Sequence, residues 1–240
     1  MMQIRVTRSV IPNLFTAMNM FSGFLSILHT NQGDYTYAAW LIIIAALFDA
    51  LDGIVARLTK SSSKLGVQLD SLSDVVSFGV APSFLIYSTY LNNFNTTGII
   101  ISALFMIAGG FRLARFNVQL VGFEKTFFYG LPIPLAAITI SSLILTFFNP
   151  ITGFPENITI IIIPLVLFLS LMMVTRIKYN SLPKMSLSSV KEHPFQFLSL
   201  FIVGILVTIT AGKAFFYIFV FFILFGIFQH LFNFIMLKRD

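Results

Sequence analysis

The chain has 240 residues, of which 57% are hydrophobic and only 10% are charged, and its formal net charge is +6. Soluble domains usually contain about 25% charged residues, so this composition excludes a soluble globular protein and indicates an integral α-helical membrane protein. The chain has no cysteine, which excludes disulfides and thiol chemistry. No two of its three histidines lie at the spacing of zinc ligands, so a zinc site is not predicted.

Hydrophobic runs close to 20 residues long predict eight membrane spans. The predicted fold class is therefore an all-α, polytopic helical bundle in a membrane. The last two spans are the least clearly separated, because only three residues lie between them. The spans cover approximately residues 10–30, 35–57, 67–91, 97–117, 130–148, 157–175, 196–212 and 214–237.

The distribution of basic residues predicts the orientation of these spans. Fourteen of the 15 lysines and arginines would lie on one side of the membrane, and only Lys213 on the other. Cytoplasmic loops are enriched in Lys and Arg, so both termini are expected in the cytoplasm. No basic stripe lies outside these loops, and nucleic acid is therefore not a predicted partner. The fourteen residues are Arg5, Arg8, Arg57, Lys60, Lys64, Arg112, Arg115, Lys125, Arg176, Lys178, Lys184, Lys191, Lys238 and Arg239.

The first span carries a polar stripe made of Asn13, Thr16 and Asn19, each three residues after the last. At helical spacing these side chains lie near one face of the span. One interpretation is hydrogen bonding between helices, which polar residues commonly provide inside membranes. The functional interpretation is that the stripe faces the acidic cluster of the next two spans.

That cluster lies in the stretch DALDGIVARLTKSSSKLGVQLDSLSD, between two strongly apolar runs. Asp70 and Asp74 are one helical turn apart on the third span. If the second and third spans face each other, four carboxylates gather in one place. On the second span, two aspartates share a helix face with two small residues and an arginine: Asp49, Asp52, Gly53, Ala56 and Arg57.

Carboxylates inside a membrane need cationic partners. Each costs roughly 2.5 to 3.5 kcal/mol near mid-depth, so four unpaired acids would be untenable together. Arg57 is one partner, and a bound divalent metal is the better one, because oxygen donors suit Mg²⁺, Mn²⁺ or Ca²⁺. The small residues Gly53, Ala56 and Gly66 would let a bulky ligand or a neighbouring backbone approach closely.

The same stretch resembles a family signature. It reads DxxDGxxAR, then eight residues, then GxxxDxxxD, with all eight fixed positions filled between Asp49 and Asp74. This pattern is similar to that of the CDP-alcohol phosphotransferases, membrane enzymes that make phospholipid head groups. The strings SLSDVVSFGVAPS, FRLARFN and FYGLPIP further resemble the bacterial branch of that family that uses serine as the acceptor.

The resemblance implies transfer of the phosphatidyl group of CDP-diacylglycerol to L-serine, giving phosphatidylserine and CMP. It implies an active site facing the cytoplasm, in the bacterial cytoplasmic membrane, and homodimers are common in the family. In the matching motif, Asp49, Asp52 and Asp70 correspond to ligands of one or two Mg²⁺ or Mn²⁺ ions. Asp74 corresponds to the general base and can share the metal. The expected contacts to CDP-diacylglycerol are Asn13, Thr16, Gly53, Ala56, Arg57 and Gly66.

Two arginines near the end of the fourth span, Arg112 and Arg115, admit two interpretations. They are i, i+3 neighbours and could simply anchor the topology at the cytoplasmic surface. Alternatively they point inward and bind an anionic substrate group, such as the serine carboxylate, since a guanidinium forms paired hydrogen bonds with a carboxylate.

Other functions stay open at this stage. The same signature occurs in relatives that accept glycerol phosphate, inositol phosphate or choline. A cation transporter would spread its acids along several helices, whereas here all four lie on two. A structural membrane protein would pair acids with cations at equal depth, and only Arg57, Arg112 and Arg115 are candidates. We expect residues 1–240 to form a single membrane-embedded domain, with the active site in 49–74 and accessory helices at about 196–237.

Overall fold

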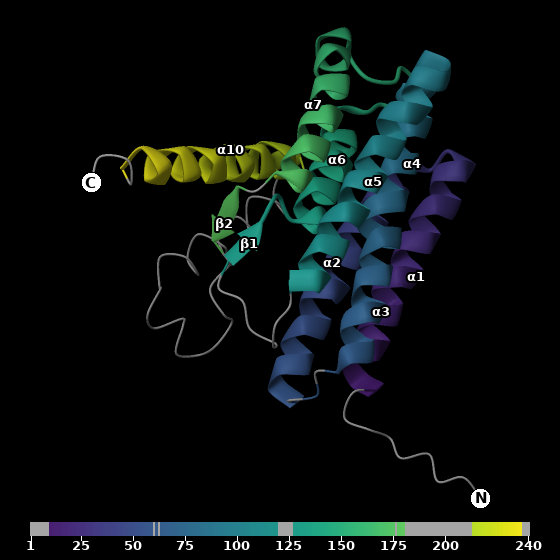
Figure 1. The fold of residues 1–240 in the computed structure, drawn as a ribbon. Coiled ribbons are helices and arrows are strands. Elements are labelled where there is room, and N and C mark those ends of the chain that lie inside the picture. The colour runs from purple at the N-terminus through teal and green to yellow at the C-terminus, as the bar shows by residue number, and fades with distance from the viewer. Residues whose placement is uncertain are drawn as a thin grey trace, which may run out of the picture.

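The structure is a computed structural model, and it describes residues 10–59, 61, 63–119, 127–175, 177–180 and 213–236. Most of the long helices run side by side, and one lies across them (Figure 1). The elements are α1 (Val10–Gln32), α2 (Tyr35–Thr59), α3 (Lys64–Asp74), the π-helix η1 (Val75–Val80), α4 (Ala81–Thr89), the 3₁₀ helix η2 (Leu91–Phe94), α5 (Asn95–Gln119), β1 (Phe127–Tyr129), α6 (Ile133–Phe147), α7 (Glu156–Val174), β2 (Lys178–Asn180) and α10 (Lys213–Met236).

Five helical segments are long and apolar enough to cross a membrane. They lie at the positions of the first four predicted spans and the sixth, which confirms an α-helical architecture with several candidate membrane spans. The total of eight spans and the cytoplasmic placement of both termini stay predictions. The five segments are Val10–Gln32, Tyr35–Thr59, Leu65–Thr89, Leu91–Val118 and Glu156–Val174.

The fifth predicted span is shorter in the structure than its hydropathy suggests. α6 has 15 residues, which corresponds to about 22 Å of helix, less than the roughly 30 Å of a hydrocarbon core. The apolar run 130–148 is longer, but Gly130 has a φ of 78° and Pro132 is extended, with a ψ of 132°. The backbone therefore turns before α6 begins, although the residues there remain hydrophobic.

The two C-terminal spans have different outcomes. The predicted span 214–237 is helical as α10, but this helix lies crosswise to the other long helices rather than along them (Figure 1). The predicted span 196–212 lies outside the described residues. Both chain termini also lie outside them, so nothing in the structure tests their side of the membrane.

α1 buries its polar side chains and exposes its apolar ones. Thr16, Asn19 and Ser26 are at most 4% exposed, whereas Leu14 is 61% and Phe21 52% exposed. This is the reverse of a helix on a water-soluble protein and fits a helix that faces lipid on its outer side. The buried hydroxyls find partners: Ser26 Oγ donates to the Ala38 carbonyl of α2 at 2.9 Å.

The apolar core lies among α2, η1, α4, α5, α6 and α7, with a contribution from α10. Its largest fully buried side chains include Phe78, Phe105, Leu85 and Ile140. Outside the helices, β1 and β2 form a short antiparallel pair in which Phe128 faces Tyr179. This pair connects the chain after α5 with the chain after α7, and it was not predicted from the sequence.

Candidate active site

The acids come from two helices that both pack against α1. α2 carries Asp49 and Asp52 in its second half, and α3 carries Asp70 and Asp74. The chain reverses direction between them. Ser63 caps α3, because its Oγ accepts a hydrogen bond from the Gly66 N–H at 3.0 Å. The two helices therefore bring their acids to a similar depth from opposite directions.

Three of the four carboxylates converge. Oxygen atoms of Asp49, Asp70 and Asp74 all lie within 4.8 Å of one another. Asp74 is only 7% exposed, and one carboxylate oxygen of Asp70, Oδ1, is buried without a hydrogen-bond partner among the described residues. Such a cluster repels itself unless a cation lies within it.

Asp52 belongs to the same region but lies outside that group of three. It is 7% exposed, and its Oδ2 accepts a hydrogen bond from the Thr16 hydroxyl of α1 at 2.9 Å. The structure thus brings together three of the four predicted metal ligands, with the fourth held beside them by α1.

The polar stripe of α1 faces the acidic cluster. Besides Thr16, the Asn19 amide donates to Asp74 Oδ1 at 3.2 Å. In the other direction, Ser73 Oγ donates to the Thr16 carbonyl at 3.0 Å. The stripe therefore bonds between helices and faces the acids, and its expected contact with the nucleotide stays a prediction. Asn19 was noted in the stripe but not among the predicted site residues, and only its spacing from Thr16 could have suggested it.

A close contact between α1 and η1 fixes the position of Asp74. Ser77 of η1 donates its hydroxyl to the Asn19 carbonyl at 2.8 Å. Gly23, one turn further along α1, lies so close to Ser77 that a Cβ on it would be 2.6 Å from the Ser77 Cα. π-Helical turns often occur at functional sites, and this one begins at the residue after Asp74.

Small residues make room along the motif helices. A Cβ on Gly53 would lie 3.5 Å from a guanidinium nitrogen of Arg57, so that side chain extends back along α2 over the glycine. A Cβ on Gly66 would lie 3.4 Å from Asn13 Oδ1. Gly53 therefore lies beside Arg57, and Gly66 lies beside Asn13, near the connection between α2 and α3.

The two arginines of α5 have different surroundings. Arg112 is 7% exposed, its Nε has no hydrogen-bond partner among the described residues, and it interacts electrostatically with Asp74 and Asp49. Arg115 instead donates to backbone carbonyls at the end of α7, at 2.7 Å to Val174 and 3.1 Å to Thr175. Arg112 is therefore buried within electrostatic reach of the acids, while Arg115 joins α5 to α7.

The string that contains these arginines also supplies Asn117. Its Nδ2 donates to Ser71 Oγ of α3 at 2.8 Å, and its Oδ1 is buried without a partner among the described residues. Ser71 directly follows Asp70, so Asn117 brings α5 to the edge of the acidic cluster. Sequence reasoning quoted this asparagine in FRLARFN but gave it no role.

A family model described as CDP-alcohol phosphatidyltransferase matches residues 9–172, more than half of the chain and all of the acidic cluster. The chain belongs to this family. Other CDP-alcohol phosphatidyltransferases are similar over most of its length. The CDP-diacylglycerol–serine O-phosphatidyltransferase of Helicobacter pylori (strain ATCC 700392 / 26695) is 39% identical over 173 residues, 72% of this chain and 73% of that protein.

Two archaeal relatives are about equally similar. The archaetidylserine synthase of Methanothermobacter thermautotrophicus is 42% identical over 181 residues, 75% of this chain and 73% of that protein. The CDP-diacylglycerol–serine O-phosphatidyltransferase of Methanocaldococcus jannaschii is 38% identical over 174 residues, 72% of this chain and 75% of that protein. All three names contain serine; two of them also name CDP-diacylglycerol, and the third names archaetidylserine.

The three clustered aspartates of this chain suit a hard metal ion. Asp49, Asp70 and Asp74 offer only carboxylate oxygens, the ligands that Mg²⁺ and Mn²⁺ prefer. The buried Asp70 oxygen without a partner is the kind of atom that a bound cation would satisfy. The residues present therefore fit a divalent cation, and they do not by themselves distinguish one such ion from another.

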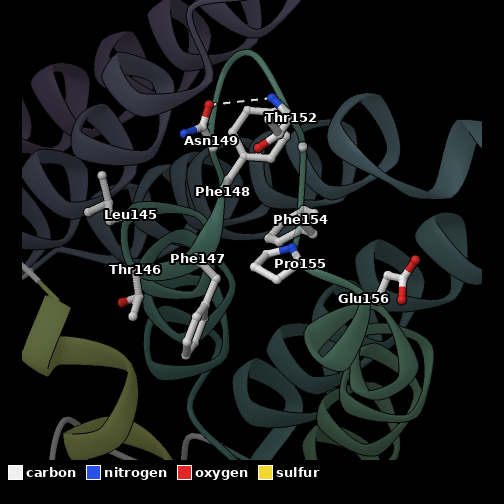
Figure 2. Close-up of a pocket in the computed structure, with 10 residues that line it drawn as sticks. Leu145, Thr146, Phe147, Phe148, Asn149, Thr152, Phe154, Pro155 and Glu156 are labelled. Atoms are coloured by element: carbon white, nitrogen blue, oxygen red, sulfur yellow. Dashed lines mark hydrogen bonds between the residues drawn. The ribbon is translucent and has the colours of Figure 1, made fainter.

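A cavity among the described residues lies away from these acids. It has a volume of about 580 Å³ and is formed by the loop between α6 and α7, where Asn149 accepts a hydrogen bond from the Thr152 N–H (Figure 2). Phe148 in this loop packs on Tyr35 at the start of α2. Asp49 is 14 residues further along α2, roughly 20 Å away. The cavity therefore contains none of the predicted site residues.

Proposed function

We propose that this chain transfers the phosphatidyl group of CDP-diacylglycerol to L-serine, giving phosphatidylserine and CMP. The observation that carries the proposal is the agreement of three relatives, at 38% to 42% identity over about three quarters of the chain, on serine as the acceptor named in each. The clustered acids of the family signature supply the site at which this chemistry would occur.

The reaction is a single displacement at phosphorus. The serine hydroxyl oxygen forms a bond to the phosphorus that carries diacylglycerol, the bond from that phosphorus to the bridging oxygen of the pyrophosphate breaks, and CMP leaves. The hydroxyl proton must pass to a base near the attacking oxygen. Asp74 is the proposed base. Its Oδ1 accepts from the Asn19 amide, which orients the carboxylate.

Asp49, Asp52, Asp70 and Asp74 would hold one or two divalent cations, Mg²⁺ or Mn²⁺. When bound, such an ion neutralises the pyrophosphate and stabilises the negative charge of the departing CMP. Thr16 holds the Asp52 carboxylate by a hydrogen bond, so that α1 sets its orientation before substrate binds.

CDP-diacylglycerol would bind along the motif faces of α2 and α3. The proposed contacts are Asn13, Thr16, Gly53, Ala56, Arg57 and Gly66. The exposed guanidinium of Arg57 beside Gly53 is suited to a phosphate, because it offers paired donors at a fixed spacing. The glycines leave the backbone open to the nucleotide.

Serine needs a cation for its carboxylate. Arg112 and Arg115 are the predicted ligands, and their contacts favour Arg112. Arg112 is buried near Asp74 with an unpartnered Nε among the described residues. Arg115 already donates to the carbonyls that end α7. We therefore assign the carboxylate to Arg112 and leave Arg115 as a second, weaker contact.

The proposed setting is the bacterial cytoplasmic membrane. The acids lie in the second half of α2 and in the first half of the segment Leu65–Thr89. Both halves adjoin the connection between α2 and α3, which is predicted to be cytoplasmic. Serine is water-soluble and CDP-diacylglycerol is membrane-bound, so a site at this depth reaches both. A homodimer, as the family resemblance suggests, belongs to the same proposal, as does a single domain over residues 1–240.

The decisive experiment is an assay of the purified full chain with CDP-diacylglycerol and Mg²⁺ or Mn²⁺. L-serine, glycerol 3-phosphate, inositol phosphate and choline are each supplied separately as the labelled acceptor. We expect a labelled lipid product and CMP in equal amounts with serine alone. Turnover with one of the other acceptors and none with serine would show that the chain uses a different acceptor within the same family.

A further inference from the structure

Two polar atoms of α5 are buried without partners among the described residues and lie beside the acidic cluster. One is the donor Nε of Arg112, and the other is the acceptor Oδ1 of Asn117. Buried polar atoms are nearly always hydrogen-bonded, so each such atom requires an explanation. Both residues approach α3, because Asn117 bonds to Ser71 and Arg112 interacts electrostatically with Asp74, three residues further along that helix. A donor and an acceptor left open there suggest a ligand that carries both an anion and a cation.

The orientation of the Asn117 amide follows from its neighbour. Ser71 Oγ donates its only proton to the Val67 carbonyl at 3.1 Å, so it can only accept from Asn117. The atom of Asn117 facing Ser71 must therefore be the NH₂ group. The carbonyl oxygen Oδ1 is then left facing away from this bond, with no partner among the described residues.

We propose that Asn117 Oδ1 accepts a hydrogen bond from the ammonium group of the acceptor serine, so that Asn117 selects acceptors that carry an amine. This inference rests on the proposed function, and it adds a residue for the part of serine that Arg112 does not bind. An ammonium has donors and no lone pair, so it requires an acceptor oxygen. Arg112 offers only donors and suits the carboxylate.

The charge of the site explains why a neutral oxygen is suited to this role. Asn117 bonds to Ser71, the residue after Asp70, and Asp70 belongs to the acids that would hold the metal. An ammonium bound by one of them would compete with the cation for the same oxygens. A fifth carboxylate would instead attract a further cation. An amide oxygen held by Ser71 binds the ammonium without either effect, and the Ser71 bond fixes the amide plane.

The test compares two acceptors that differ only in the amine: L-serine and 3-hydroxypropionate, which keeps the hydroxyl and the carboxylate. The assay uses the full-length purified protein with CDP-diacylglycerol and Mg²⁺. The wild-type protein should prefer serine by roughly tenfold or more in kcat/KM, because the analogue lacks the ammonium that donates a charge-assisted hydrogen bond. Asn117→Ala should lose most of this preference, through a higher KM for serine, while its kcat/KM for 3-hydroxypropionate stays close to that of wild type.

Ser71→Ala is the matched control, because it removes the bond between α5 and α3 but leaves Oδ1 in place. Because that bond also orients the amide, this variant should lose part of the serine preference, but clearly less of it than Asn117→Ala. If Asn117→Ala does not accumulate in membranes, Asn117→Leu fills the same space without polar atoms and repeats the comparison. An equal loss on both acceptors in these Asn117 variants, or an unchanged preference, overturns the inference. The proposed function fails separately, if wild type does not use serine at all.

Discussion

At the scale of single residues, the aspartates are held in different ways, and this predicts different losses on substitution. Asp74 is buried, and the Asn19 amide orients its carboxylate by a hydrogen bond. Asp49 and Asp70 each place a carboxylate oxygen within 4.8 Å of it. Asp74→Asn removes the proposed base, so kcat should fall roughly 10²- to 10⁴-fold. The KM for CDP-diacylglycerol should change much less. Steady-state kinetics of the purified variants measure both quantities.

A metal titration tests whether the acids hold a divalent cation. Asp49→Asn, Asp52→Asn and Asp70→Asn should each insert into the membrane normally and lose metal-dependent turnover. Chelation should abolish wild-type activity, and added Mg²⁺ or Mn²⁺ should restore it, because four acids without a cation repel both one another and the pyrophosphate. Full wild-type turnover in excess EDTA would contradict a metal site at these acids.

The two arginines of α5 should separate into a binding and a structural residue. Arg112→Ala should raise the KM for serine about ten- to a hundredfold, the cost of one charge-assisted hydrogen bond. Arg115→Ala should instead lower the thermal midpoint in detergent, because its guanidinium holds the last carbonyls of α7. That loss is expected to be about 1 to 3 kcal/mol of stability.

Arg→Lys variants provide the control for this pair. An ammonium lacks the planar fork, so Arg112→Lys should restore serine binding only in part. If Arg112→Ala keeps wild-type serine kinetics while Arg115→Ala loses them, the assignment of the two residues is reversed. The contacts of Arg115 could not be predicted, because its acceptors lie 58 to 60 residues further along the chain.

At the scale of elements, the contact of α1 with η1 determines where Asp74 lies. Gly23→Ala would place a Cβ 2.6 Å from the Ser77 Cα, a backbone atom that cannot move away by a rotamer change. α1 and η1 must then separate, which displaces both Asn19 and Asp74. A displacement of about 1 Å in a site can cost 10²-fold in rate, so kcat should fall by at least tenfold.

Gly110→Ala is the matched control, since a Cβ on that glycine of α5 meets no atom within 4 Å. This variant should retain wild-type activity and thermal stability. Both substitutions replace a helical glycine by alanine and carry the same gain in helix propensity, so a difference between them reports the packing. Equal activity of Gly23→Ala and wild type would show that α1 does not position Asp74.

Periodicity and hydropathy predict elements well where the membrane imposes the pattern. The acids at i, i+3 on α2 and i, i+4 on α3 were placed correctly, because helical spacing alone fixes their faces. The same reasoning missed η1, since VVSFGV is as apolar as an α-helical turn. It overextended α6, because Gly130 and Pro132 change the backbone without reducing hydrophobicity.

At the scale of the whole molecule, composition predicts a membrane protein but not the direction of each helix. α10 is hydrophobic over its full length, which fitted a span, yet it lies across the bundle (Figure 1). Hydropathy measures whether a segment prefers an apolar environment, and packing against neighbouring helices decides its tilt. The predicted spans therefore agree best with the observed helices from α1 to α5.

The absence of native cysteine allows a direct test of the topology. Asn93 lies in η2 between α4 and α5 and is exposed, while Ser61 lies in the connection between α2 and α3. The helical segment Leu65–Thr89 between them is long and apolar enough to cross a membrane once, so we expect the two positions on opposite sides. In intact cells, a membrane-impermeant maleimide should label Asn93→Cys and should leave Ser61→Cys unlabelled.

The control for accessibility is permeabilised cells, in which the maleimide should label both variants. Asp240→Cys should behave like Ser61→Cys if the C-terminus is cytoplasmic. Labelling of Ser61→Cys from outside would place the acidic cluster near the opposite surface, where cytoplasmic serine is not available to it.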